Sequence, residues 1–199
     1  MKIGILGGTF NPIHSGHIKM AEFVAGKMEL DKICFLPNGQ PPHKNSNTIA
    51  DKHHRLQMVK IAIADYDNFY VSDYEINREG NCYTIDTIKH FKSADDNDYY
   101  FIIGADSLFQ LDKWKNADEL KKICNFIVCD RGGSGDTMKE VERLKKSGCR
   151  IWLTDMPLID IDSTSIRDKI KNGKDISDFV PKRVQEYIDK NNLYIGGRI

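Results

Sequence analysis

The sequence lacks an excess of charge of either sign. It holds 29 Lys and Arg residues against 29 Asp and Glu residues, so its formal net charge is zero. A neutral chain gives no sign of DNA or of a membrane surface as a partner. It also lacks any run near the roughly 18 apolar residues of a membrane span, and its Met-Lys start lacks the shape of a signal peptide. We expect a cytoplasmic globular protein with no nucleic-acid or membrane partner. The sequence leaves open a local basic site for a small anion and a homo-oligomer.

The five cysteines lack the pattern of a structural site. Their number is odd, and no two of them form a CxxC pair. Neither a zinc site nor a disulfide framework is indicated. The glycine-containing loop after the first apolar run also lacks the Gly-Lys-Ser/Thr of a Walker P-loop and the GxGxxG of a dinucleotide-binding loop.

What the sequence does contain is an alternation of short apolar runs with longer amphipathic ones. The short runs predict strands at Lys2–Gly7, Lys32–Pro37, Phe69–Glu75, Tyr99–Asp106, Asn125–Arg131 and Arg150–Asp155. The longer patterns predict helices at Gly16–Met28, Asp51–Tyr66, Thr84–Phe91, Ala117–Ile123, Thr137–Ser147, Ser163–Asn172 and Pro181–Asn191. This order predicts an α/β fold, a doubly wound parallel sheet with helices on both faces, in a single domain over residues 1–199. Ligands of such sheets bind beyond the carboxyl ends of the strands.

The first such loop reads GGTFNPIHSGH, from Gly7 to His17. Its paired glycines allow a sharp turn and a close approach to a ligand. The loop opens into a helix, whose N-terminal N–H groups and dipole attract phosphate. His14 and His17 are potential cations at this positive end, and such a broken local rule tends to mark function. The alternatives are surface or capping histidines, or a zinc pair that has no evident third ligand.

A second predicted helix also begins with a cation near its positive end, in IDIDSTSIR, which ends at Arg167. Ser163, Thr164 and Ser165 are good N-cap candidates, and Arg167 follows in the first turn. A planar guanidinium matches phosphate oxygens, although a capped helix with a solvated arginine is the plainer alternative. We expect the two openings to converge on one polyphosphate.

GTFNPIHSGH resembles the HxGH signature of the nucleotidyltransferases, which share a Rossmann-like core with class I aminoacyl-tRNA synthetases. IDIDSTSIR resembles their second signature, with Asp162 at a position often held by serine. Three further stretches, PPHK, NCYTIDTIKHF and FIIGADSLFQLDKW, resemble the nicotinate-nucleotide adenylyltransferases. The resemblance covers nearly the whole chain. It implies adenylyl transfer from ATP to nicotinate mononucleotide, with Mg²⁺ carried by the ATP phosphates and no evident metal ligand from the protein.

The resemblance also implies a role for each residue that matches a motif. It implies catalytic roles for His14, His17, Lys44 and Arg167. It implies ATP contacts from Gly7, Gly8, Thr9, Phe10, Gly104, Asp106, Ser163 and Thr164, with Asp106 accepting hydrogen bonds from ribose hydroxyls. For the mononucleotide, Lys44 helps to hold phosphate, Thr84 lies near the nicotinate carboxylate and Trp114 stacks on the ring.

Other interpretations stay open at this point. Thr84 could simply cap a helix, Asp106 could be a buried cap, Trp114 could be core, and the loop that carries Lys44 could be an idle surface loop. For the whole chain, the competitors are a pantetheine-phosphate adenylyltransferase, a nucleotide-binding sensor without turnover and an RNA-binding synthetase fragment, which would need a basic patch. The residues do not decide between nicotinate and nicotinamide mononucleotide as the acceptor.

Overall fold

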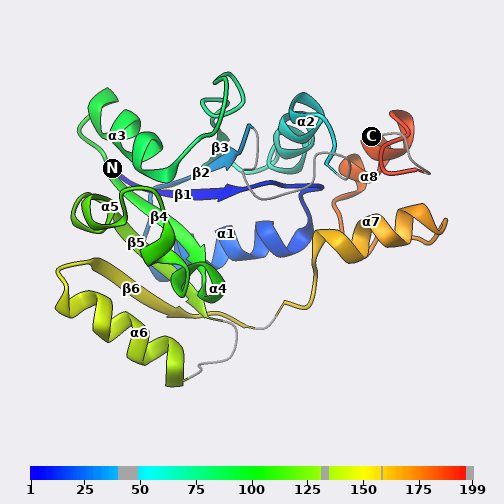
Figure 1. Ribbon diagram of the computed structural model, residues 1–199. Helices are drawn as coiled ribbons and strands as arrows, with labels where there is room; N and C mark the ends of the chain where they lie inside the picture. The colour runs from blue at the N-terminus through cyan, green and yellow to red at the C-terminus, as the bar shows by residue number, and fades with distance from the viewer. Residues whose placement is uncertain (40–48, 131–134, 158, 196–199) are drawn as a thin grey trace. The chain divides into compact units, whose positions relative to one another are not determined.

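The computed structural model describes residues 1–39, 49–130, 135–157 and 159–195 (Figure 1). Six strands form one sheet in the order β3–β2–β1–β4–β5–β6. Their bounds are β1 Lys2–Gly8, β2 Lys32–Pro37, β3 Phe69–Val71, β4 Asp98–Gly104, β5 Asn125–Asp130 and β6 Arg150–Asp155. β4 runs parallel to both β1 and β5, and β5 runs parallel to β6. The order reverses where β1 meets β4, so the predicted doubly wound α/β fold is confirmed.

Helices connect these strands, and every helix that the sequence predicts is present. Their bounds are α1 Ser15–Lys27, α2 Lys52–Ala62, α3 Thr84–Ala94, α5 Ala117–Ile123, α6 Gly135–Lys146, α7 Ser163–Lys171 and α8 Lys182–Lys190. The short helix α4, Ala105–Leu108, and a 3₁₀ turn at Leu111–Lys113 were not predicted. Within the described ranges, no helix combines the length and the apolar character that crossing a membrane requires.

Two predicted strands are too long. β3 ends at Val71 rather than at Glu75. Beyond it, the Ser72 N–H still donates to the Phe35 carbonyl at 2.9 Å. The Tyr74 N–H then donates to the Ser72 hydroxyl at 3.3 Å and the Asn77 N–H donates to the Asp73 carbonyl at 3.0 Å, so the chain turns, since such local bonds compete with sheet pairing. The strand predicted at Tyr99–Asp106 ends at Gly104, because Ala105 already begins α4 and its carbonyl accepts from the Phe109 N–H.

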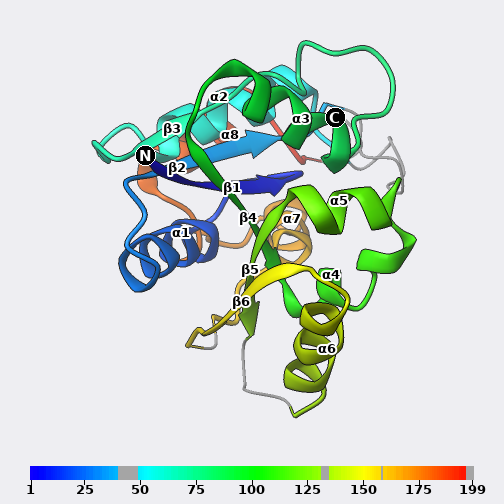
Figure 2. The same cartoon turned by 90° about the vertical axis from the view of Figure 1, so that its left-hand side faces the viewer.

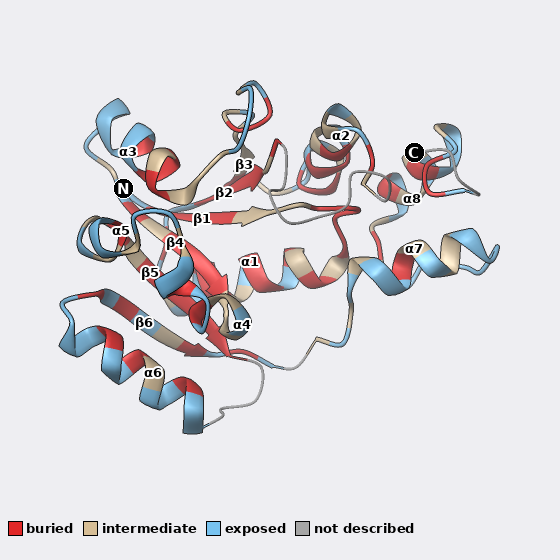
Figure 3. Ribbon diagram, in the orientation of Figure 1, coloured by how far each residue is buried: buried red, intermediate tan, exposed pale blue. Residues whose placement is uncertain are grey.

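The chain divides into two compact units, of which the first comprises Met1–Gly7, Met20–Cys34 and Cys82–Ile159. Figure 2 shows α1 on one side of β4 and β5, and α4, α5 and α6 on the other. β5 is buried over five consecutive residues, Phe126–Asp130, and Figure 3 shows the burial concentrated on the strands. Such a run, apolar except at its last residue, is typical of a parallel strand that is covered on both faces.

The second unit comprises Gly8–Lys19, Phe35–Asn81 and Asp160–Ile199. Within it α2 packs against α8, where the His54 Nδ1 lies 2.9 Å from the Tyr187 hydroxyl and the Arg183 guanidinium lies 3.1 Å from the Asp65 carboxylate. This unit holds most of the loop from Gly7 to His17 together with the opening of α7.

Candidate functional site

The loop after β1 is bent tightly around one aromatic ring. Phe10 is buried and has φ +48°, a left-handed conformation that bulky residues rarely adopt. A Cβ added to Gly8 would lie 3.1 Å from the Phe10 ring. The ring therefore fills the space that a side chain at position 8 would need, and this strained turn fixes the course of the backbone ahead of the histidines.

His14 and His17 lie against each other at the start of α1. Their ring centroids are 3.7 Å apart with an interplanar angle of 31°, and the Phe10 ring meets His17 edge-on at 4.9 Å. The backbone N–H of His14 donates to the Nδ1 of His17 at 3.3 Å. Because this Nδ1 accepts, a neutral His17 carries its proton on Nε2. His17 therefore carries a ring N–H that can donate a hydrogen bond to an anionic oxygen.

The N-cap of α7 is Asp162, which corrects the expectation that Ser163, Thr164 or Ser165 fills this position. Its Oδ1 accepts from the N–H groups of Thr164 and Ser165 at 2.9 and 3.0 Å. The carboxylate reaches both N–H groups from the residue before the helix, and Ser163 becomes the first helical residue. The hydroxyl and N–H of Ser165 hold the pKa of Asp162 below its usual value, and His14 acts in the same direction.

The opening of α7 contacts the loop that leads into α1. The Ser163 hydroxyl donates to the Pro12 carbonyl at 3.0 Å. The Arg167 Nη1 donates to the Asn11 carbonyl at 2.9 Å, and its Nη2 donates to the Thr164 hydroxyl at 3.2 Å. The two helix openings, about 150 residues apart in the chain, thus meet at one loop, which brings Arg167 and Ser163 to the segment that carries the histidines.

Three of the site residues expected in the first unit, Gly7, Gly104 and Asp106, lie at or just beyond the carboxyl ends of β1 and β4. A Cβ on Gly7 would lie 3.1 Å from the Phe101 ring, so a side chain there would crowd β4. Gly104 ends β4 in an extended conformation, and Asp106 stands exposed in the first turn of α4. Asp106 is therefore not the buried cap that the sequence left open.

Thr84 and Trp114 lie on segments that a cation–π contact joins. Thr84 is the first residue of α3, whose N-cap is Tyr83, so Thr84 does not cap the helix. Trp114 is half-buried and meets Phe101 edge-on at 6.2 Å. Its neighbour Lys115 places its Nζ 5.1 Å from the centre of the Tyr83 ring, a distance at which cation–π attraction operates. Sequence reasoning missed Tyr83 and Lys115, although both are direct neighbours of motif residues.

Lys44 and the rest of PPHK lie outside the described residues. Described residues on either side of this stretch accept hydrogen bonds from an arginine that sequence reasoning also missed. Arg55 on α2 is 1% exposed, and it donates to carbonyl groups in three separate segments. Its position in the sequence could have drawn attention to it, because Arg55 shares the apolar stripe of α2 with Met58, Val59 and Ala62.

A protein-built metal centre needs several ligating side chains close together. Within those ranges, no group of three or more His, Cys, Asp or Glu residues gathers closely enough to hold an ion. The donors described at the loop are N–H groups of histidine and arginine, which suit phosphate oxygens rather than a hard cation such as Mg²⁺.

Comparison with known proteins assigns the chain to a family. Residues 5–169 match the family model described as cytidylyltransferase-like. The chain is 46% identical over 197 residues to a probable nicotinate-nucleotide adenylyltransferase of Clostridium novyi, covering 97% of this chain and 98% of the relative. It is 43% identical to a protein of the same description from a Thermoanaerobacter species, covering 98% and 94% of the two chains.

The fold agrees with that assignment. The structure of a Plasmodium falciparum nicotinic acid mononucleotide adenylyltransferase complexed with NaAD superimposes with a TM-score of 0.81 at 24% identity, covering 97% of each chain. At this identity the likeness shows a common fold. Together with the near full-length relatives, these matches show that the chain belongs to the nicotinate-nucleotide adenylyltransferase family of cytidylyltransferase-like proteins.

Proposed function

We propose that the protein transfers the adenylyl group of ATP to nicotinate mononucleotide, forming deamido-NAD and pyrophosphate. The observation that carries this proposal is the docking of Arg167 and Ser163 on the loop that bears His14 and His17. Membership of the nicotinate-nucleotide adenylyltransferase family supports the choice of acceptor. We propose further that residues 1–199 act as a single nucleotidyltransferase domain in the cytoplasm, where ATP is supplied.

The reaction that we propose needs no nucleophile from the protein. A phosphate oxygen of the mononucleotide attacks the α-phosphorus of ATP in line, a new P–O bond forms, and the bond to the departing pyrophosphate breaks. The protein contributes position and charge, as in other phosphoryl transfers. Orientation of two bound reactants lowers the barrier by roughly 7–11 kcal/mol, so most of the rate enhancement is available from geometry alone.

The second unit supplies the groups that we assign to the triphosphate. The Nε2–H of His17 donates to the α-phosphate as its charge develops, with His14 stacked beside it. Arg167 uses two of its five N–H groups within the described part of the chain, and we assign the others to the leaving pyrophosphate. Ser163 assists by holding the loop through Pro12. Gly8, Thr9 and Phe10 let the backbone approach ATP closely, and Thr164 supports Arg167.

The remaining assignments rest on the family resemblance. In the first unit, Gly7 and Gly104 allow close approach of ATP, and Asp106 accepts hydrogen bonds from ribose hydroxyls. Thr84 lies near the nicotinate carboxylate and Trp114 stacks on the ring, with Lys115 as a nearby cation. Lys44 neutralises phosphate charge. We treat Mg²⁺ as part of the substrate, bound to phosphate oxygens and water, where it offsets their charge.

Pyrophosphate release tests the proposal. The protein is incubated with ATP, Mg²⁺ and one acceptor at a time: nicotinate mononucleotide, nicotinamide mononucleotide or 4′-phosphopantetheine. We expect release with the mononucleotides, and the ratio of their kcat/KM values gives the preference. Release with phosphopantetheine alone would contradict the choice of acceptor, and ATP binding without any release would indicate a sensor.

The same assay tests His17. Removing one well-aimed donor to a developing oxyanion lowers kcat by about a hundredfold or more, so His17→Ala should show such a loss with an unchanged far-UV circular dichroism spectrum. Near-normal turnover in that variant would remove His17 from the mechanism.

A further inference from the structure

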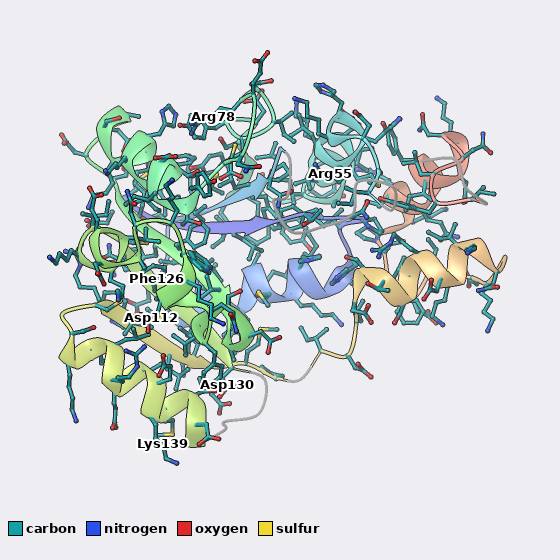
Figure 4. The ribbon with its side chains drawn as sticks, viewed as in Figure 1. Arg55, Arg78, Asp112, Phe126, Asp130 and Lys139 are labelled. Carbon is teal, nitrogen blue, oxygen red and sulfur yellow. The ribbon has the colours of Figure 1, made fainter. Side chains whose placement is uncertain are left out.

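Arg55 carries a positive charge next to the loop that bears the histidines. It lies on α2, as Figure 4 shows, and its guanidinium makes five hydrogen bonds with residues that the structure describes. Nη1 donates to the Thr9 carbonyl at 2.7 Å and to the Asn38 Oδ1 at 3.3 Å. Nη2 donates to the Asn38 and Gly39 carbonyls, each at 2.8 Å, and Nε donates to the Ala50 carbonyl at 3.1 Å. All these acceptors are neutral oxygens.

The acceptors belong to segments that the fold must hold together. Thr9 lies in the loop after β1, while Asn38 and Gly39 follow β2. Asn38 binds the first loop directly as well, since its N–H donates to the Gly8 carbonyl at 3.0 Å. Gly39 packs closely against the Glu75 carbonyl oxygen, because a Cβ at this position would overlap that atom. One guanidinium therefore joins the two loops, mainly through their backbone carbonyls.

A second buried contact supports the same loop from the C-terminal region. The Asn11 Oδ1 accepts from the Tyr194 hydroxyl at 3.0 Å and from the Ala50 N–H at 2.9 Å. Ala50 thus donates to Asn11 and accepts from Arg55. Burial raises the pKa of the Tyr194 hydroxyl far above its usual value, so Tyr194 remains a neutral donor throughout the working range of the enzyme.

The charge of Arg55 adds an electrostatic element. Burial lowers the pKa of Arg55, and the carboxylate of Asp51 acts in the opposite direction. A guanidinium nevertheless stays protonated in proteins. Its hydrogen bonds to described residues end on neutral oxygens, so this buried cation attracts an anion that is held at the same loop, because the interior screens charge poorly.

We propose that Arg55 is a positioning residue for the adenylyl transfer. Its guanidinium holds the loop at Thr9 and the chain at Asn38 and Gly39 in one geometry, and its charge adds positive potential to the triphosphate site. Tyr194 completes this support through Asn11. The inference rests on the proposed function. It adds a role for residues that never touch the reacting atoms, and it extends the triphosphate site to α2 and to the C-terminal region.

Two substitutions separate geometry from charge. Arg55→Lys keeps the charge and loses the fork of donors, whereas Arg55→Met loses both. Misplacement of a reacting group by about 1 Å can cost a hundredfold in rate, so both variants should lose tenfold or more in kcat at 25 °C while their far-UV circular dichroism spectra match that of the wild type. Arg183→Met, on α8 at the surface ion pair with Asp65, is the matched control and should keep the wild-type kcat.

Binding of inorganic pyrophosphate, measured by calorimetry without the acceptor, isolates the charge of Arg55 when Arg55→Met is compared with Arg55→Lys, because both variants lose the fork of donors. We expect weaker binding in Arg55→Met than in Arg55→Lys, and wild-type binding in Arg183→Met. Equal pyrophosphate affinity in all variants would overturn the electrostatic part. Wild-type kcat in folded Arg55→Lys would overturn the positioning part, because a residue that served stability alone would lower Tm and spare turnover.

Two tyrosines give an independent test if the Arg55 variants do not fold. Tyr194→Phe removes the donor to Asn11 and should lower kcat severalfold. Tyr187→Phe removes a hydroxyl that faces His54 on α2 instead, and it should not change kcat. Equal turnover in Tyr194→Phe and Tyr187→Phe would overturn the proposal. If the wild-type enzyme shows no turnover, the proposed function fails, and pyrophosphate binding still tests Arg55.

Discussion

The carboxylate of Asp162 caps α7 where the proposed triphosphate site opens, and its replacement separates capping from charge. Oδ1 accepts two backbone N–H groups, and Oδ2 accepts from the Ser165 hydroxyl at 2.6 Å. Asp162→Ala removes all three bonds, and loss of an N-cap costs about 1 kcal/mol of unfolding free energy. In a chain of this size, that lowers Tm by about 2–4 °C, measured by calorimetry. Asp162→Ser keeps an oxygen at the cap and should lose little.

The stability difference between wild type and Asp162→Ala should depend on pH in one direction. The hydrogen bonds from Ser165 and Thr164 depress the pKa of Asp162. A depressed pKa in the folded state means that the contribution is fully present above the unfolded value of about 3.9 and is lost as the pH falls through the folded value. The two Tm curves should therefore run parallel above about pH 5 and approach each other below about pH 4.

The functional effect has the opposite sign. Asp162 places a negative charge at a helix opening that we assign to a polyanion. Two like charges 4 Å apart in water repel by about 1 kcal/mol, which corresponds to about fivefold in affinity. Asp162→Ser removes the charge, keeps the cap and should lower the KM for ATP by up to about fivefold, an effect that shrinks at high salt.

Asp175 is the matched control for this charge effect. Its carboxylate accepts from the Ser177 hydroxyl at 2.6 Å and from the Ser177 N–H at 3.0 Å, a local arrangement like that of Asp162. Asp175→Ser should leave the KM for ATP unchanged. A higher KM for ATP in Asp162→Ser would refute the reasoning, since it would mean that the carboxylate assists the triphosphate instead of repelling it.

Three further substitutions address other parts of the molecule. Trp114→Ala should raise the KM for the mononucleotide and spare that for ATP in steady-state kinetics, and a defect confined to ATP would place Trp114 on the wrong substrate. Gly39→Ala should destabilise the fold by several kcal/mol in urea unfolding, because its Cβ would overlap the Glu75 carbonyl oxygen; a loss under about 1 kcal/mol would show that the backbone relaxes. Asp112→Asn weakens ion pairs with Lys121 and Arg143 in which Asp112 itself is exposed, so it should cost under about 1 kcal/mol, and a larger loss in thermal unfolding would show that these bridges act as a network.

The strands were predictable because a strand that is buried on both faces appears in the sequence as a short continuous run of apolar residues. β5 reads as a run of apolar residues in the sequence, and the structure buries it from Phe126 onward. The ends were harder to predict. Aromatic and apolar residues recur beyond Val71, at Tyr74 and Ile76. Local hydrogen bonds, from the Tyr74 N–H to the Ser72 hydroxyl and from the Asn77 N–H to the Asp73 carbonyl, show that the chain turns there. Such competition between a side chain and the ladder leaves no distinct trace in composition.

The helix openings of the site were predictable because a cation there breaks a local rule. Which residue caps α7 was not, since Asp and Ser are about equally good N-caps. Asp162, Ser163, Thr164 and Ser165 all qualify by propensity. The structure selects Asp162 because Ser163 uses its hydroxyl on Pro12, 151 positions away in the sequence. A contact with a residue distant in the sequence thus helps to decide which residue caps the helix.

Arg55 shows most clearly where sequence reasoning stops. An arginine on the apolar stripe of a helix can extend its guanidinium to water and bury only its stem, and the pattern with Met58 and Val59 is the same in either case. Burial of the whole side chain requires acceptors for every N–H group, because an unsatisfied buried charge is far more costly than a buried hydrocarbon. Four of the five acceptors are backbone carbonyls in loops, which have no side-chain signature, and the fifth is the side-chain oxygen of Asn38. Most of the support therefore does not depend on the identity of neighbouring side chains, whereas Lys in place of Arg55 removes the fork that reaches the acceptors.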